Sequence, residues 1–447
     1  MIDTFTIRCN ILHLAFSGKL TNQIKEEGTA KDILDLISNR KPLVSVEDGP
    51  YTLPDSWAWV RLKDLYKINP RIIADNDTEA AFIPMERISG GFDRSFTFEI
   101  QKWEKASKNH TKFEDGDIAF AKITPCFENR KSFIAQDLPN GIGGGTTELI
   151  ILRQKEMLPQ YTYYLVLDQR FISTGTASYK GVVGQQRVQS DVIKNYLVPV
   201  APYSEQKRIV KKIEQAFSVL DTIDELQAQY ADNLTALKSK LIDAAIQGKL
   251  TEQLPEDGTA EELYQQIQEE KQKLIKEGKI KKQKPLPEIT DDEIPFDIPE
   301  NWKWVRLGKL ISIESGRGLT ASNMNPGDFP VYGGNGIAGY HNCGFVPSKT
   351  IVIGRVGYYC GSVHITEKES WVTDNAFVTS YPEKHIDKYY LAYTLQHMKL
   401  GQNNNGAAQP VVSGKKIYPL AFPLPPLAEQ KRIVQKLEEI LPLCKKQ

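Results

Sequence analysis

The chain has 447 residues, of which 40% are hydrophobic and 25% charged, a composition that predicts a soluble globular protein of about three domains' length. Lysine plus arginine equals aspartate plus glutamate at 56 each, so net charge gives no support for a nucleic-acid partner, which usually shows as a basic excess. The aliphatic runs are short, and the first residues lack a basic flank and a cleavage site, so neither a membrane span nor a signal peptide is predicted. Five scattered cysteines without a CxxC pair predict a reducing compartment, the cytoplasm, and no disulfide framework.

Three segments of the chain occur twice, in the same order. The segment GKLTNQIKEEGTAKDILDLI returns as GKLTEQLPEDGTAEELYQQI with half of its positions identical. The repeated pairs are 18–37 with 248–267, 53–65 with 298–310, and 202–214 with 426–438. A chain built as two copies of one unit is suited to a target with two halves, because each copy presents an equivalent surface.

The predicted elements follow this repeat along the chain. Two mixed α/β domains, called domain 1 and domain 2 below, alternate with helical segments and Pro-rich charged connectors. The predicted order is residues 1–20, the N-terminal part of a distal long helix; 21–52, a short helix and connector; 53–203, domain 1; 204–250, a central long helix; 251–297, a short helix and charged linker; 298–426, domain 2; and 427–447, the C-terminal part of the distal helix.

The central helix carries apolar residues at intervals of three and four over several heptads, which is the pattern of a coiled-coil seam. Residues 1–20 match 231–250 and residues 428–447 match 204–223, so the second long helix is predicted to be divided between the two chain ends. Antiparallel packing of the two helices would bury both apolar stripes and bring the termini together. The fold class is therefore α+β, with two mixed domains on a long antiparallel helix pair and a pseudo-two-fold repeat. The alternative is a tandem duplication whose helices stack within one globule.

The two domains differ in sequence, but they share a frame when aligned from their ends. Residues 116–135 align with 349–367, each as a strand, a turn and a returning strand, so that Lys122 aligns with Arg355. Residues 146–152 align with 373–379, and residues 182–193 with 406–417, which pairs Gln185 with Gln409. A preserved scaffold thus carries two diverged domains, as expected when the scaffold has one task and the domains recognise different things.

The motifs GKLT-x-Q with EDGTA, W-x-W-V-R-L, IVIGRVG with WVTDNAFV, and PLPPLAEQKRIV resemble the specificity subunit of type I restriction-modification systems. The resemblance covers essentially the whole chain, and the order of the motifs is far more specific than any one of them. It implies that domains 1 and 2 are target-recognition domains, each reading one half of a bipartite double-stranded DNA sequence.

The same resemblance implies partners and places the cofactors outside this chain. Two adenine-N6 methyltransferase subunits would bind the specificity subunit, and ATP-dependent restriction subunits would join for cleavage. S-adenosylmethionine, ATP and Mg²⁺ would be held by those partners, and no membrane partner is implied.

Two equivalent recognition domains on one face of B-DNA should lie about 34–36 Å apart. A helix of some 40 residues, about 60 Å long, could act as a ruler that fixes the spacer between the half-sites.

Catalytic machinery is missing from the sequence, so no catalytic residue is predicted. There is no GxxxxGK[ST] phosphate loop and no NPPY or DPPY tetrapeptide. The run GIGGG at 141–145 weakly resembles a glycine-rich cofactor-binding loop, but it precedes a predicted strand rather than a helix. Two rival interpretations stay open: a self-sufficient DNA methyltransferase or nuclease with divergent motifs, and a coiled-coil adaptor that binds only proteins.

Four residues of domain 2 have side chains of the kinds that bind zinc: His341, Cys343, Cys360 and His364. Their spacing is unusual and simple packing is the favoured interpretation, so no metal is predicted.

The predicted DNA contacts are side chains that can bond base edges or phosphates and that lie beside glycines, which allow the backbone to approach a ligand closely. In domain 1 they are Lys122, Thr124, Asn129, Arg130, Lys131, Lys180, Gln185, Gln186 and Arg187. In domain 2 they are Arg317, Tyr332, Asn335, Arg355, Asn403, Asn404 and Gln409.

The repeated tryptophans Trp57, Trp59, Trp302 and Trp304 are expected to pack in the base of each domain rather than stack on bases. The repeated EQKRIV motif places Lys207, Arg208, Lys431 and Arg432 on helices. Contact with DNA phosphates or with a methyltransferase subunit is one interpretation of these cations, and a solvated helix face is the default. The half-site sequences, the spacer length and the presence of a restriction subunit do not follow from the sequence.

Overall fold

The computed structural model describes residues 1–37, 49–182, 184–278, 285–398, 400–401 and 411–444. They form two compact units, Met1–Gln227 and Ala228–Gln447, and each unit is described by itself. The boundary falls inside α8 (Tyr203–Ile246), a 44-residue helix that confirms the predicted central helix. Within the described ranges, no helix is both long and apolar enough to span a bilayer.

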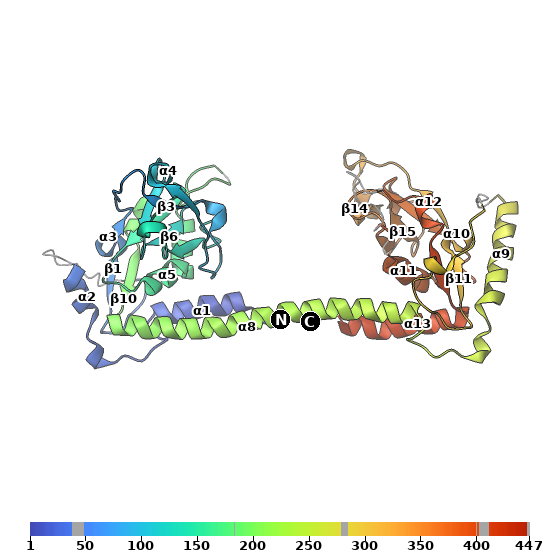
Figure 1. Cartoon of the computed structure of the whole chain (residues 1–447), viewed down its shortest axis with the longest axis horizontal. Coiled ribbons are helices and arrows are strands. Elements are labelled where there is room, and N and C mark those ends of the chain that lie inside the picture. The colour runs from blue at the N-terminus through green and yellow to red at the C-terminus, as the bar shows by residue number, and fades with distance from the viewer. Residues whose placement is uncertain (38–48, 183, 279–284, 399, 402–410, 445–447) are drawn as a thin grey trace. The chain divides into compact units, whose positions relative to one another are not determined.

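Unit 1 begins with α1 (Thr4–Phe16), which lies antiparallel to the first half of α8 (Figure 1). Thr4 bonds Asp224 near the start of α1, and Lys212 bonds the Leu20 carbonyl just beyond its end. The two helices share a core in which Leu12 and Ile209 are fully buried. The predicted pairing of the N-terminal helix with the central helix is therefore confirmed within this unit.

Domain 1 consists of three small sheets with helices packed against them. The sheets have the strand orders β1-β10, β2-β9-β6-β7 and β4-β3-β8-β5. The strands are β1 (Ala58–Arg61), β2 (Lys67–Ile68), β3 (Glu79–Ile83), β4 (Glu99–Lys102), β5 (Thr111–Glu114), β6 (Ile118–Ala121), β7 (Ser132–Ile134), β8 (Ile142–Gly145), β9 (Leu149–Arg153) and β10 (Leu197–Val200). The helices of the domain are α3 (Leu62–Leu65), α4 (Trp103–Ser107), α5 (Pro159–Leu167), α6 (Gln169–Thr176) and α7 (Ser190–Lys194), and α2 (Ala30–Ile37) precedes it in the chain.

Unit 2 repeats this plan with the second half of α8. Its sheets have the orders β11-β19, β12-β18-β15-β16 and β14-β13-β17. The strands are β11 (Lys303–Arg306), β12 (Ser312–Ser315), β13 (Phe329–Gly333), β14 (Gly336–His341), β15 (Ile351–Gly354), β16 (Val363–Ile365), β17 (Trp371–Val372), β18 (Ala376–Ser380) and β19 (Ala421–Leu424). The helices are α9 (Ala260–Lys276), α10 (Leu307–Leu310), α11 (Lys388–His397), α12 (Gly414–Ile417) and α13 (Leu427–Ile440). Ile433 and Leu437 of α13 share a core with Ala245 of α8.

The four-stranded sheets β2-β9-β6-β7 and β12-β18-β15-β16 agree in strand register as well as in strand order. Ala121 of β6 pairs with Leu149 of β9, and Gly354 of β15 pairs with Ala376 of β18. These are equivalent positions in the sequence alignment of residues 116–135 with 349–367 and of 146–152 with 373–379. The common frame predicted from sequence is therefore present in both domains, and the predicted fold class is confirmed.

One repeated glycine marks where each scaffold helix stops. Gly18 after α1 and Gly248 after α8 both have φ of +70°, the left-handed conformation that commonly ends a helix. A Cβ on either glycine would lie 2.4 Å from a proline ring, of Pro54 in unit 1 and of Pro299 in unit 2. Both the turn and the close proline contact therefore require glycine, which explains why GKL occurs at both places.

Candidate nucleic-acid interface

The repeated motifs meet at the base of each domain around one buried carboxylate. In unit 1, Glu205 of EQKRIV accepts hydrogen bonds from Thr21 Oγ1 at 2.8 Å, Gln23 Nε2 at 2.9 Å and Trp57 Nε1 at 2.8 Å. In unit 2, Glu429 accepts bonds from the equivalent Thr251, Gln253 and Trp302 at 3.2, 2.9 and 2.8 Å. Glu205 is 1% exposed and Glu429 is fully buried. The repeat thus preserves a buried joint between helix, connector and domain.

The arginines of EQKRIV extend the same joint. Arg208 forms a two-pronged ion pair with Glu27 at 2.5 and 2.8 Å, and Arg432 forms one with Asp257 at 2.5 and 2.8 Å. Each guanidinium also donates to a nearby backbone carbonyl, of Asn22 or Glu252. Arg208 and Arg432 therefore hold the connectors to the helices, whereas Lys207 and Lys431 are exposed.

Trp57, Trp59 and Trp302 are buried, as expected for core packing.

In domain 1, the two predicted clusters of DNA-contacting residues come together. The Lys122 amide donates to the Glu148 carbonyl at 2.8 Å, and the Thr124 amide donates to the Gln186 carbonyl at 2.9 Å. Lys180 and Arg187 exchange both backbone hydrogen bonds, at 3.1 and 2.9 Å. The turn after β6 and the 180–187 loop therefore form one surface, which is called the domain 1 tip below; it comprises residues 122–124, 148, 180–182 and 184–187.

Three other predicted contacts in domain 1 lie elsewhere. Arg130 is 5% exposed, and its guanidinium donates to the Leu167 carbonyl at 2.9 Å and to Gln169 at 2.6 Å. Its φ of 54° turns the chain at this point. Lys131 donates to the Met85 carbonyl at 2.8 Å, while Asn129 is exposed. These placements favour a packing role for Arg130 and Lys131 over the predicted DNA contact.

Domain 2 repeats the geometry of the tip with different side chains. The Arg355 amide donates to the Asn375 carbonyl at 2.8 Å, just as Lys122 bonds Glu148 in domain 1. The Arg355 guanidinium donates to Ser315 at 3.1 Å and lies over the ring of Phe377. Asn375 is exposed. The structure therefore places a long cation at the same point of both frames.

A cleft of about 980 Å³ lies beside this point in domain 2. Asn335 lines it and is exposed, and Asn375 belongs to its wall. Tyr358 and Tyr359 also line it, with exposed fractions of 88% and 55%. Such aromatic faces can stack on bases, and the backbone beside them is glycine-rich.

The other predicted residues of domain 2 have mixed placements. Tyr332 is 3% exposed and belongs to a small core, so its ring packs rather than faces a ligand. Arg317 is exposed and its guanidinium lies 4.1 Å from the ring centre of Phe345. Asn403, Asn404 and Gln409 lie outside the described residues.

The four candidate zinc ligands have other surroundings. His341 Nδ1 accepts a bond from the Asn325 amide at 3.0 Å, and His364 Nε2 lies 3.2 Å from Ser362 Oγ. Cys360 is buried in the domain 2 core and Cys343 is exposed. In the described part of the chain, no three or more His, Cys, Asp or Glu side chains are grouped to hold a metal ion.

The glycine run 141–145 is accounted for by packing. Gly143, Gly144 and Gly145 lie in β8, a buried strand between β3 and β5. A Cβ at Gly144 would lie 1.9 Å from the Ala106 carbonyl, and one at Gly143 would lie 2.4 Å from the Phe113 ring. The run therefore allows α4 and the neighbouring strand to pack closely.

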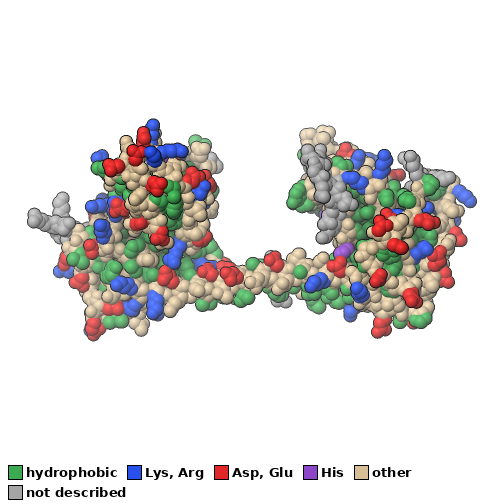
Figure 2. Space-filling model, viewed as in Figure 1, with side chains coloured by type: hydrophobic (Ala, Val, Ile, Leu, Met, Phe, Trp, Pro, Cys, Tyr) green, Lys and Arg blue, Asp and Glu red, His purple; other side chains and the backbone are tan. Residues whose placement is uncertain are grey.

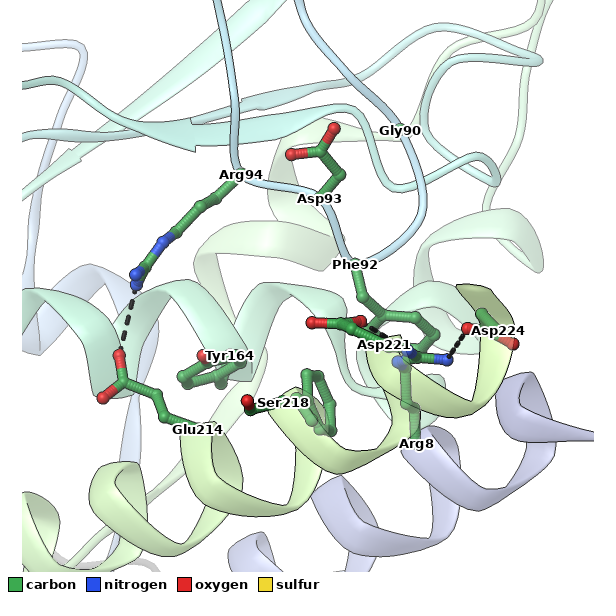
Figure 3. Close-up of a pocket in the computed structure, with 11 residues that line it drawn as sticks. Arg8, Gly90, Phe92, Asp93, Arg94, Tyr164, Glu214, Ser218, Asp221 and Asp224 are labelled. Carbon is green, nitrogen blue, oxygen red and sulfur yellow. Dashed lines mark hydrogen bonds and ion pairs between the residues drawn. The ribbon is translucent and has the colours of Figure 1, made fainter. Parts of the chain in front are cut away.

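A second cleft, of about 750 Å³, lies between domain 1 and the scaffold helices of unit 1 (Figure 3). Arg8 bonds Asp221 at 2.6 Å and Asp224 at 2.9 Å, and Arg94 pairs with Glu214 at 3.2 Å. These cations are thus paired within the cleft, where they join the 84–98 loop and α1 to α8. On the face shown in Figure 2, basic and acidic side chains are interspersed over unit 1.

Sequence reasoning missed Glu148, Tyr358, Tyr359 and Asn375. Glu148 and Asn375 occupy equivalent positions directly before a buried strand, so the alignment of 146–152 with 373–379 contained a signal for both. The tandem tyrosines stand between glycines in GRVGYYCG, a setting that favours an exposed turn.

Comparisons with known proteins identify the family. A model of the type I restriction modification DNA specificity domain matches residues 54–229 and 299–444. The specificity subunit of the type I restriction enzyme EcoAI from Escherichia coli is 30% identical over 98% of this chain and 88% of its own length. The EcoEI specificity subunit from Escherichia coli is 37% identical over 68% of this chain and 61% of its own length.

Solved structures agree in fold. A chain from a study of complex assembly and conformational transition of the type I R-M system has a TM-score of 0.66 at 19% identity, covering 88% of this chain and 92% of that one. The HsdS subunit from Thermoanaerobacter tengcongensis has a TM-score of 0.52 at 20% identity, with 89% and 92% covered. The duplicated frame, the two matched domains and these relatives lead to one conclusion: the chain belongs to the specificity subunits of type I restriction-modification systems.

Proposed function

We propose that this specificity subunit reads a bipartite double-stranded DNA target, with domain 1 reading one half-site and domain 2 the other. The observation that carries this proposal is a shared frame with different tips. The β6–β9 and β15–β18 pairs have the same register, yet the tip carries Lys122, Glu148 and Arg187 in domain 1 and Arg355, Asn375 and Val411 in domain 2. A common frame presents both tips in the same way, and different side chains select different bases.

The proposal assigns the chemistry to partner subunits. Two adenine-N6 methyltransferase subunits dock on the repeated scaffold, and restriction subunits join for cleavage. S-adenosylmethionine, ATP and Mg²⁺ are bound by those subunits, and the complex works in the cytoplasm. The buried Glu205 and Glu429 joints support this arrangement, because two equivalent joints give two equivalent partners the same surface to bind.

Reconstitution tests this assignment. The purified chain is incubated with S-adenosylmethionine and genomic DNA, first alone and then with the methyltransferase subunits. We expect no adenine methylation by the chain alone and methylation at one bipartite sequence with the partners present. Methyl transfer by the chain alone would mean that it is an enzyme in its own right. Methylation by the complex without any sequence preference would mean that the chain is only an adaptor.

A further inference from the structure

The domain 1 tip holds an arginine in a fixed orientation. Arg187 donates from Nε to the two carboxylate oxygens of Glu148 at 3.0 and 3.2 Å, and from Nη2 to Oε1 at 2.8 Å. Its Nη1 donates to the Gln185 carbonyl at 3.2 Å. The Arg187 side chain is 45% exposed and the Glu148 side chain 21%. Two-pronged contact between these side chains fixes the guanidinium plane more firmly than a single bond.

Both partners of this pair are anchored by backbone. Arg187 exchanges two hydrogen bonds with Lys180 and forms a bridge with Ile123. Glu148 directly precedes β9, and its carbonyl accepts the Lys122 amide. The guanidinium is therefore held by backbone hydrogen bonds that link the 180–187 loop to the turn after β6, and a base-reading group needs such support.

Donor counting shows what Arg187 has left to offer. A guanidinium carries five N–H groups, and the contacts with Glu148 and Gln185 use three of them. Among the described residues, one N–H on each terminal nitrogen is left without a hydrogen-bond partner. One N–H on each terminal nitrogen of an arginine can bond the O6 and N7 acceptors that guanine presents in the major groove.

Domain 2 provides an internal comparison for the pair. The bridge Ile123–Arg187 of domain 1 corresponds to the bridge Val356–Val411 of domain 2. Glu148 corresponds to Asn375 by the hydrogen bond each carbonyl accepts. Domain 2 has Val411 in place of the arginine and Asn375 in place of the glutamate. Both side chains of the pair therefore differ between the two domains.

An acid at a DNA-facing surface needs an explanation, because it repels phosphates. Hydrogen bonding from Arg187 is the largest cause holding the pKa of Glu148 below its ordinary value, and Lys122 also lowers this pKa. The carboxylate therefore stays ionised at neutral pH, and its charge is matched by Arg187. The position of Glu148 in the tip allows it to orient Arg187. An arginine that only contacted a phosphate would not need such a partner.

We propose that Arg187 reads a guanine in the half-site of domain 1 through its two remaining N–H groups, and that Glu148 is the positioning residue that orients them. This inference rests on the proposed function, because it assumes that domain 1 contacts a half-site. Asn375 and Val411 occupy the equivalent positions in domain 2, so the second half-site is not read by an arginine–glutamate pair of this kind.

The test maps methylated sites produced by the reconstituted complex with full-length variants of this chain. For Arg187→Ala, we expect one guanine position of the first half-site to relax, with discrimination against the other bases falling about 5- to 150-fold. Arg187→Lys keeps the charge but loses the two parallel N–H donors of the guanidinium, so it should relax the same position. Glu148→Gln should relax that position as well, with no change at its neighbours. Val411→Ala is the matched control and should leave the first half-site unchanged.

Several results would overturn the inference. One is an unchanged first half-site in Arg187→Ala or Arg187→Lys; another is relaxation in Arg187→Ala that Glu148→Gln does not share. A uniform loss of binding at every sequence would assign Arg187 to a phosphate instead. Where a variant methylates too slowly to map, binding competition with a pool randomised in the first half-site gives the same comparison. If exchanging the whole of domain 1 left the first half-site unchanged, the proposed function itself would fail, which is a different result.

Discussion

At the scale of single residues, the two buried glutamates explain why sequence motifs far apart in the chain repeat together. Glu205 satisfies donors from the GKLT-x-Q segment and from the first tryptophan of W-x-W-V-R-L, and Glu429 does the same in the second unit. A change in one of these motifs would leave a buried polar group without a partner. The motifs are therefore linked by one hydrogen-bond network.

This network leads to a stability prediction. Glu205→Ala should lower the unfolding free energy of unit 1 by about 2–3 kcal/mol, because three donors lose a buried acceptor. Calorimetry of the full chain measures the shift of the corresponding transition. Glu225→Ala, an exposed position on the same helix, is the control and should change stability by less than about 0.5 kcal/mol. Equal effects of the two variants would contradict the assigned role.

Residue-scale predictions from sequence were least successful where a side chain's direction mattered. Lys122, Thr124, Gln185, Gln186 and Arg187 come together as a surface, as the spacing of polar groups around strands suggested. Arg130 instead turns inward at a residue with positive φ and stacks against Phe5 and Phe92. Sequence shows that a cation is present but not which side of a turn it takes. Glu148 was missed because an acid is not an obvious candidate for binding DNA.

At the scale of elements, the strand–turn–strand segments were the most predictable part. Alternating strand signals at 116–135 and 349–367 located β6, β7, β15 and β16, and the alignment of the two domains is confirmed in register. Elements without a repeated signal, such as the parallel pairs β3–β8 and β13–β17, were not predicted, because long-range pairing leaves little local trace.

One element-scale difference separates the copies at the W-x-W-V-R-L motif. Arg306 is 6% exposed and donates to Glu293, to the carbonyls of Pro287 and Glu288, and to the Pro419 carbonyl. Its equivalent, Arg61, is exposed. Arg306 therefore ties the linker before domain 2 to the domain itself.

Limited proteolysis tests this tie. Arg306→Ala should speed cleavage within residues 285–297 by at least several-fold at neutral pH, because the linker loses its contacts with the domain. Arg61→Ala is the matched control and should leave the cleavage pattern as in the parent chain. An unchanged rate in Arg306→Ala would show that other contacts hold the linker.

The same ion pair predicts a pH dependence. The hydrogen bond from Arg306 is the largest cause that lowers the pKa of Glu293 from 4.5 to about 2. Because the folded-state pKa is depressed, the contribution of this pair is present above about pH 4.5 and is lost as the pH falls toward 2. NMR of the Glu293 carboxyl carbon should show a midpoint near 2. In Arg306→Ala the midpoint should return toward 4.5, and a midpoint that stays low would contradict the assigned cause.

At the scale of the whole molecule, α8 is one element that belongs to both units. The prediction that the helices at the chain ends act as one divided helix stays a prediction, as does the ruler. Inserting one heptad between Gln227 and Ala228 adds about 10 Å of helix, or roughly three base pairs of B-DNA. The methylated sequence should keep both half-sites and gain a longer spacer. Methylation with the original spacer would argue against a ruler.

The central claim is that each domain reads its own half-site on a shared frame. The most direct measurement maps methylated adenines after residues 53–203 are exchanged for the corresponding domain of another specificity subunit, with the parent chain mapped in parallel. The account predicts a new first half-site, with the second half-site and the spacer unchanged. Loss of both half-sites together, or a first half-site that stays the same, would contradict it.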